Sequence, residues 1–133
     1  MKLNHLDLHV YDVPGTLAFF RDMFELTPVT AATSPRLAVL ADGHGFVLVL
    51  QRCAEGERYP DGFHAGFLVD DVAEVRRLHA RAVAGGLPVS EVLVNGRGTM
   101  IYLARPEGYH VEVSCQRRNF ATPDPGSADE SPR

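Results

Sequence analysis

The sequence contains no tryptophan, a single lysine and only two cysteines among its 133 residues. Its 13 lysines and arginines are outnumbered by 17 aspartates and glutamates, and they form no long basic run. A protein that binds nucleic acid through its phosphates needs such a concentration of positive charge. We therefore expect no nucleic acid among the partners of this chain.

Cysteine pairs and long apolar runs are also missing. Cys53 and Cys115 are isolated thiols without the C-x-x-C spacing of a metal or redox motif and without the density of a disulfide scaffold. The opening residues, MKLNHLDLHV, alternate polar and apolar side chains, whereas a signal peptide needs a continuous apolar core. No apolar run approaches the roughly 18 residues of a membrane span. These absences predict a reduced, cytoplasmic protein with no membrane partner.

The size and composition predict one domain followed by a tail. With 45% hydrophobic residues, a chain of this length can bury one compact core but is too short for two independent domains of usual size. Its last residues are rich in proline, serine, aspartate and glycine and offer almost nothing apolar to bury. The sequence therefore predicts a single domain over residues 1–118 and a disordered tail over residues 119–133.

The first half begins with an alternating pattern and continues with a helical one. Residues 5–10 (HLDLHV) alternate polar and apolar side chains, as in a strand with one buried face. Asp12 predicts a helix N-cap, Pro14 suits the first turn, and apolar residues follow at helical spacing until Pro28 stops the helix. Three short strands are predicted next, over residues 29–33, 36–41 and 45–51.

The second half repeats these signals in the same order. Residues 64–69 (HAGFLV) predict a strand, Asp71 predicts the N-cap of a helix, and Gly85 and Gly86 predict its end. Three more strands are predicted over residues 89–94, 99–104 and 109–115.

The two halves can be superposed on each other. An offset of 59 residues (64 minus 5) places His5 on His64 and Asp12 on Asp71. Matching residue types at matching structural signals indicate a duplicated unit. Each unit has the order βαβββ, over about residues 2–53 and 62–116.

These features resemble the vicinal oxygen chelate superfamily. The resemblance rests on the doubled βαβββ order, on a histidine in the first strand of each half, and on the ending PEGYHVE in residues 106–112. The superfamily includes glyoxalase I, extradiol dioxygenases, thiol-transferring fosfomycin-resistance enzymes and metal-free bleomycin-binding proteins. The resemblance covers residues 2–116. It implies an α+β fold whose two units form a cup-shaped mixed β-sheet with the helices outside (the glyoxalase/bleomycin resistance/dihydroxybiphenyl dioxygenase fold), and it implies a homodimer.

The resemblance also implies a metal site in the cup. His5, His64 and Glu112 fall on the positions where metalloenzymes of the superfamily carry two histidines and a glutamate. Such a set suits a divalent ion, Fe, Mn, Ni or Zn, with open positions for the two oxygens of a small-molecule substrate. His9 and Tyr102 are the expected proton-handling residues. The candidates for substrate binding are Asp7, Gln51, Arg97, His110 and Ser114.

Two departures from the family patterns narrow the activity. Glyoxalase I carries a further glutamate at the end of the last strand of its first half, where this chain has Val49 and Gln51. Because that reaction moves a proton between adjacent carbons, glyoxalase I proper is disfavoured. The extradiol pattern around Tyr102 is met except at Arg105, and the histidine upstream of the tyrosine is missing.

Three functions therefore stay open at this point. The first is a metal-dependent lyase, isomerase or dioxygenase that acts on a small molecule with vicinal oxygens. The second is a non-enzymatic protein that sequesters a drug or metabolite, as bleomycin-resistance proteins do. The third is an accessory protein whose metal site has decayed. The polar residues of the expected cup favour the first, because buried polar groups need partners or a coordinated ion.

Overall fold

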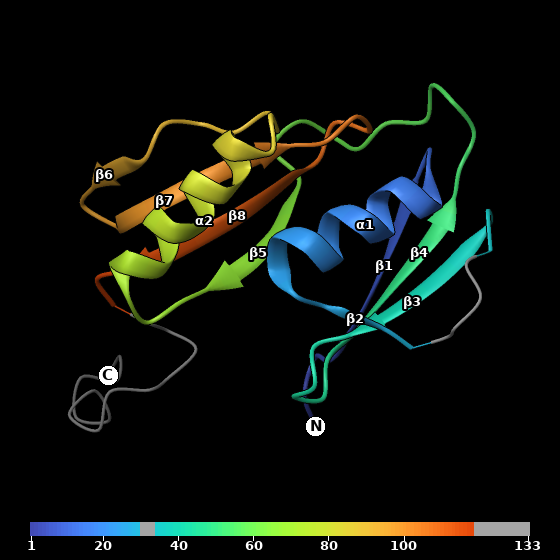
Figure 1. Ribbon diagram of the computed structural model, residues 1–133, viewed down its shortest axis with the longest axis horizontal. Helices are drawn as coiled ribbons and strands as arrows, with labels where there is room; N and C mark the ends of the chain where they lie inside the picture. Colours follow the sequence, from blue (N-terminus) through green and yellow to red (C-terminus); the bar gives the residue numbers. More distant parts are fainter. Residues whose placement is uncertain (30–33, 119–133) are drawn as a thin grey trace, which may run out of the picture. The chain divides into compact units, whose positions relative to one another are not determined.

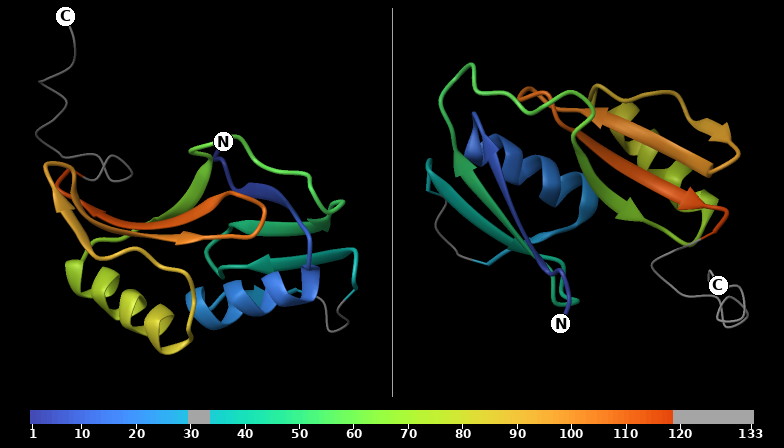
Figure 2. Two further views of the ribbon diagram at one scale, coloured as in Figure 1. Left: turned by 90° about the horizontal axis from the view of Figure 1, so that it is seen from above. Right: turned by 180° about the vertical axis from the view of Figure 1, so that it is seen from behind.

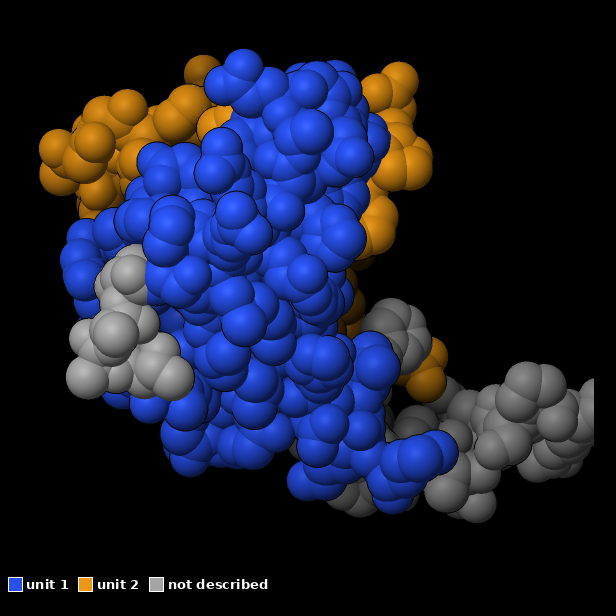
Figure 3. All heavy atoms as spheres, turned by 90° about the vertical axis from the view of Figure 1, so that its right-hand side faces the viewer, with its two compact units in different colours: residues 1–59 blue, residues 60–133 orange. Residues whose placement is uncertain are grey.

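The computed structural model describes residues 1–29 and 34–118 and divides the chain into two compact units. Unit 1 comprises residues 1–59 and unit 2 residues 60–133; Figure 3 colours them separately. The predicted tail over residues 119–133 lies outside the described residues, as does most of the predicted strand over residues 29–33.

Unit 1 is a four-stranded sheet with one helix against it (Figure 1). The sheet has the order β1-β4-β3-β2, in which β1 runs parallel to β4 and the other pairs are antiparallel. The helix α1 packs against β3 and β4, on one face of the sheet in both views of Figure 2. The elements are β1 (His5–Val10), α1 (Val13–Phe24), β2 (Thr27–Pro28), β3 (Leu37–Ala41) and β4 (Val47–Arg52).

Unit 2 has the same topology. Its sheet has the order β5-β8-β7-β6, β5 runs parallel to β8, and α2 packs against β7 and β8 (Figures 1 and 2). The elements are β5 (His64–Leu68), α2 (Val72–Ala84), β6 (Leu93–Asn95), β7 (Gly98–Ala104) and β8 (His110–Gln116). The predicted α+β fold of two βαβββ units is confirmed.

The first helix begins as predicted but ends earlier. The side chain of Asp12 accepts a hydrogen bond of 3.0 Å from the backbone N–H of Gly15, and Pro14 lies in the first turn. The helix ends at Glu25, whose φ of 60° lies in the left-handed region. Pro28 was expected to stop the helix but belongs to β2 instead. The left-handed residue ends the helix because it turns the backbone out of the helical path.

The second helix has both predicted ends. Asp71 caps it by accepting a hydrogen bond of 2.8 Å from the backbone N–H of Ala73. Gly85 closes it, and Gly86 follows with a φ of 67°, a conformation that favours glycine. Neither helix of the described residues is long and apolar enough to cross a membrane.

The predicted strand over residues 89–94 is shorter and displaced in the structure. The strand is β6, Leu93–Asn95, and Val89 forms only an isolated bridge. Between them the hydroxyl of Ser90 accepts a hydrogen bond of 3.0 Å from the backbone N–H of Tyr102. A side chain here takes the place of a backbone acceptor, so the regular ladder is interrupted.

The core of each unit lies between its helix and its sheet. Apolar side chains that alternate along the strands face the apolar stripe of the helix. In unit 1 the fully or nearly fully buried side chains include Leu8, Val10, Leu40, Leu50, Val13 and Phe20. In unit 2 they include Val75, Ala82, Ile101, Leu103, Val111 and Val113. The opposite face of each sheet is left for the polar residues of the strands.

The turn between β3 and β4 depends on Asp42. Its Oδ1 accepts hydrogen bonds from the backbone N–H groups of His44 (2.7 Å) and Phe46 (3.0 Å), and these bonds lower the pKa of the carboxyl group. We expect Asp42→Ala to lower the free energy of unfolding by about 1 kcal/mol. Because the folded pKa is depressed, the contribution of the charge is present above the unfolded pKa and is lost as the pH falls through the folded value. Urea unfolding at pH 7 and pH 3 checks this: a difference between wild type and Asp42→Ala that did not shrink at pH 3 would contradict it.

Candidate functional site

A backbone carbonyl in the turn before β5 orients the ring of His64. His64 begins β5, and its Nδ1 lies 2.9 Å from the backbone carbonyl oxygen of Gly62. A carbonyl oxygen only accepts, so Nδ1 carries the proton in the neutral ring and Nε2 keeps its lone pair. This arrangement is common among metal-binding histidines, whose second nitrogen is held by a backbone carbonyl or a carboxylate. His64 therefore presents Nε2 as a ligand atom.

Glu112 lies beside this nitrogen with one oxygen already held. It is on β8, and its side chain is only 12% exposed. Its Oε1 accepts a hydrogen bond of 2.7 Å from the hydroxyl of Tyr102, which is its register partner on β7. Its Oε2 lies 3.7 Å from Nε2 of His64. The hydrogen bond fixes the carboxylate and leaves its second oxygen next to the histidine.

Tyr102 is kept protonated by its surroundings. Burial raises the pKa of its hydroxyl, and the hydrogen bond to Glu112 raises it further. The guanidinium of Arg97, 3.4 Å from the hydroxyl oxygen, acts in the opposite direction. The ring of Tyr102 also meets that of His64 edge to face, with centroids 6.5 Å apart. Tyr102 is thus a hydrogen-bond donor that positions Glu112.

The two ligand atoms lie slightly farther apart than two atoms that bind one divalent ion. Bonds of about 2.1 Å to nitrogen and oxygen, at tetrahedral or octahedral angles, place two ligand atoms roughly 3.0–3.5 Å apart. The 3.7 Å between Nε2 of His64 and Oε2 of Glu112 is close to this range. Within the described ranges 1–29 and 34–118, no three His, Cys, Asp or Glu side chains converge on one point that could hold a metal. Among the described residues, His64 and Glu112 thus bring together two atoms of the ligand type without a third.

Gly66 on β5 makes room for the neighbouring strand β8, which carries Glu112. It is the register partner of Glu112 on β5, and a Cβ at this position would collide with the backbone carbonyl oxygen of Glu112. We expect Gly66→Ala to lower the free energy of unfolding by about 1–3 kcal/mol, because the strands must separate to accept the methyl group. Gly96→Ala is the matched control, since a Cβ there meets open space. Thermal unfolding of both variants tests this, and equal melting temperatures would contradict it.

Three of the predicted residues meet in unit 1. Asp7 on β1 accepts a hydrogen bond of 2.5 Å at Oδ2 from the side-chain amide of Gln51 on β4. Its Oδ1 lies 3.6 Å from Nε2 of His9, on the same face of β1. His5, at the start of the same strand, is exposed and shares this face. Unit 1 thus presents a row of two histidines and one carboxylate along β1.

The remaining predicted residues have different surroundings. His110 is half-buried and is the register partner of His64 across β5 and β8. Arg97 contacts the hydroxyl of Tyr102 and also lies 3.4 Å from the sulfur of Met100. Ser114 is fully buried, and among the described residues no group hydrogen-bonds its hydroxyl.

Sequence reasoning missed two groups that support the site. The carbonyl of Gly62 orients His64, and the Ser90 hydroxyl binds the backbone of Tyr102. The Asp61-Gly62 dipeptide is a turn signal that indicates where the chain bends before β5. No pattern indicates that the turn's carbonyl faces the histidine ring.

The comparisons with known proteins address the family directly. The model of the Glyoxalase/Bleomycin resistance protein/Dioxygenase superfamily matches residues 2–113, which is most of the chain. The chain belongs to this superfamily. The resemblance to vicinal oxygen chelate proteins is thereby confirmed. Among curated protein sequences, none matches the chain significantly.

Solved structures of superfamily members agree with this assignment. A possible glyoxalase from Bacillus cereus is 30% identical, with a TM-score of 0.75 over 86% of this chain and 99% of that one. A lactoylglutathione lyase from Agrobacterium tumefaciens is 26% identical, with a TM-score of 0.68 over 85% and 92%. The fosfomycin resistance protein FosX from Listeria monocytogenes, solved with Mn(II) and sulfate, is 22% identical, with a TM-score of 0.69 over 86% and 90%. At that identity the likeness to FosX concerns the fold alone.

Proposed function

We propose that this protein is a divalent-metal-dependent enzyme that acts on a small molecule with vicinal oxygens. The observation that carries the proposal is the pair of prepared ligand atoms in unit 2. Nε2 of His64 is freed by the bond to Gly62, and Oε2 of Glu112 is left beside it by the bond from Tyr102. His5 is the third ligand of the proposed site, supplied by the same chain or by a second copy in a homodimer.

Different residues of the protein would bind the substrate and transfer the proton. The bound ion would act as a Lewis acid on the substrate's oxygens and as a template that orients them. Tyr102 holds Glu112 in place by donating its hydroxyl proton, and its hydroxyl oxygen can still accept a hydrogen bond from the substrate. His9, which is exposed and lies beside Asp7, would accept and return a proton. Arg97 beside Tyr102 favours a substrate that carries negative charge.

The reaction type is proposed as lyase, isomerase or dioxygenase chemistry. Val49 and Gln51 stand where glyoxalase I carries its further glutamate, so the glyoxalase I reaction is disfavoured. The two similar structures named as a possible glyoxalase and a lactoylglutathione lyase support an enzyme of this general kind. FosX was solved with Mn(II), which makes Mn(II) a suitable probe for this chain.

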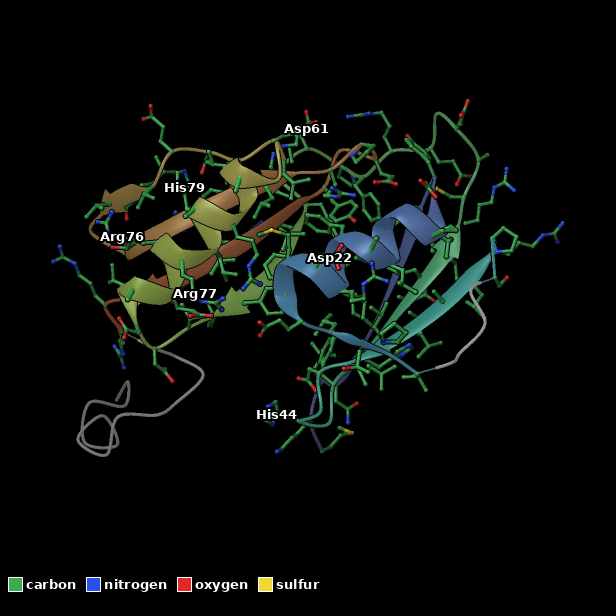
Figure 4. All side chains as sticks on the ribbon, viewed as in Figure 1. Asp22, His44, Asp61, Arg76, Arg77 and His79 are labelled. Atoms are coloured by element: carbon green, nitrogen blue, oxygen red, sulfur yellow. The ribbon has the colours of Figure 1, made fainter. Side chains whose placement is uncertain are left out.

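Metal content tests the proposal. The protein, purified without a histidine tag, is incubated with Fe(II), Mn(II), Ni(II) or Zn(II), desalted and analysed for its elements. We expect about one equivalent of at least one ion per chain. His44→Ala, a change in the exposed β3–β4 turn, controls for histidines outside the site (Figure 4). Much less than one equivalent of every ion would reject the proposed metalloenzyme. It would favour the alternative function, in which the protein sequesters a drug or metabolite.

A further inference from the structure

A cavity lies in unit 1 at the edge of the sheet where β3 begins and β4 ends. Its volume is about 530 Å³, and its lining includes Tyr11, Arg36, Arg52, Cys53 and Glu55. Pockets that bind small molecules commonly enclose roughly 300–1,000 Å³. The cavity is therefore large enough for a metabolite. None of the proposed metal ligands lines it.

Two arginines of this lining face each other across neighbouring strands. Leu37 of β3 pairs with Gln51 of β4, and one position further the backbone N–H of Arg52 donates a hydrogen bond of 2.9 Å to the carbonyl oxygen of Arg36. Residues directly opposite in an antiparallel pair lie on the same face, with Cβ atoms about 4.5–5.5 Å apart. Like charges at such positions repel each other and destabilise the pair of strands. An anion between the two guanidinium groups would remove this repulsion.

The described part of the chain supplies no such anion of its own. Within residues 1–29 and 34–118, neither Arg36 nor Arg52 forms an ion pair with a carboxylate. Glu55 also lines the cavity, but it is exposed and makes no ion pair with either arginine in these ranges. Two guanidinium groups and one carboxylate give the lining a net positive charge. Guanidinium groups bind phosphate and carboxylate oxygens through two parallel N–H donors, so the pair suits an oxyanion.

Hydrogen bonds to the segment that contains β1 hold one wall of the cavity in place. This wall is the segment that follows β4. The backbone N–H of Cys53 donates a hydrogen bond of 2.9 Å to the carbonyl oxygen of Val10. The hydroxyl of Tyr11, itself part of the lining, donates to the carbonyl oxygen of Glu57. A wall that is ordered before the ligand arrives lowers the entropic cost of binding.

We propose that this cavity binds a small molecule through a phosphoryl or carboxylate group held between Arg36 and Arg52. The site lies in unit 1 and goes beyond the proposed metalloenzyme function, because it uses no metal and no proposed metal ligand. The bound anion cancels the repulsion between the arginines. A ligand that binds only the folded protein also stabilises it.

Titrations with inorganic phosphate and with malonate test the site and distinguish the two groups. Binding is followed by the amide chemical shifts of the metal-free protein in NMR, at one ionic strength set with sodium chloride. We expect at least one of the two anions to bind wild type with saturation and to shift the amides around Arg36 and Arg52. The dissociation constant should rise at least about tenfold in the double variant Arg36→Gln/Arg52→Gln, because two charge-assisted contacts are lost.

Arg76→Gln is the matched control for the two arginines. Arg76 is an exposed arginine on α2 in unit 2, and its replacement should leave the dissociation constant unchanged (Figure 4). Circular dichroism of each variant checks that the fold is retained. No saturable binding of either anion to wild type, or equal constants in wild type and the double variant, would overturn the proposal.

Glu55→Gln tests the same electrostatic argument in the opposite direction. The substitution removes a negative charge from the lining and keeps the size of the side chain. We expect it to lower the dissociation constant for the anion, whereas the arginine variants raise it. A constant that rises in Glu55→Gln would contradict binding between the two arginines. Metal content is measured separately, so failure of this anion site leaves the proposed metal site standing.

Discussion

His64→Ala is expected to lose its divalent ion while it keeps the fold. The ring supplies one of the two prepared ligand atoms of unit 2, and its removal leaves Glu112 without the neighbouring nitrogen. The side chain of His64 is 52% exposed, so its loss opens no cavity in the core. We expect metal content after incubation and desalting to fall from about one equivalent per chain to background. The free energy of unfolding of the metal-free protein should change by less than about 0.5 kcal/mol.

His79→Ala is the matched control for this experiment. His79 lies on α2 in the same unit, away from the ligand atoms of β5 and β8 (Figure 4). This variant should retain the full equivalent of metal. Equal metal content in His64→Ala and wild type would show that the ion is bound elsewhere.

Ile101→Ala is expected to destabilise unit 2 strongly. Ile101 is fully buried on β7 and is the register partner of the fully buried Val113. Shortening a buried isoleucine to alanine removes apolar contacts and leaves a cavity, at a cost of about 2–5 kcal/mol. We expect the melting temperature of the protein to fall by roughly 10 °C.

The control for this core substitution is Leu93→Ala on β6. Leu93 is 40% exposed, so its loss should change the free energy of unfolding by much less. Calorimetry of both variants makes the comparison. A melting temperature for Ile101→Ala equal to that of Leu93→Ala would mean that the core described for unit 2 is wrong.

The sequence predicted those parts of the fold that depend on residues close together along the chain. The alternation of residues 5–10 and the N-caps Asp12 and Asp71 are observed as expected. The shorter strands were predicted less well. Thr27–Pro28 already pairs with β3, before the predicted strand start at residue 29, because the helix ends before Glu25; residues 30–33 lie outside the described residues.

The candidate site was predicted from alternation, but its geometry was not. Alternation places Glu112 on the polar face of its strand, and the duplicated pattern places His64 on the polar face of another. Only the pairing of β5 with β8 and of β7 with β8 brings His64, Glu112 and Tyr102 together. Register between strands is set by contacts distant in sequence, and a single sequence does not reveal it.

In unit 1 the contact of Gln51 could not be predicted from the sequence for the same reason, because it depends on strand register. From the sequence it was a candidate for substrate binding or weak coordination at the end of a strand. The register of β1 with β4 brings its amide next to Asp7, to which it donates a hydrogen bond. Gln51 and Asp7 meet only because β1 pairs with β4, and these two strands are far apart in the sequence of unit 1.

We propose that a divalent ion binds through a histidine nitrogen at the site of His64 and Glu112. Pulsed electron paramagnetic resonance of Mn(II) bound to the wild-type protein tests this directly, because a coordinated imidazole nitrogen modulates the electron spin echo. We predict nitrogen modulation that changes when histidine is labelled with ¹⁵N. Tightly bound Mn(II) with no nitrogen modulation, or with modulation indifferent to the histidine label, would contradict the account.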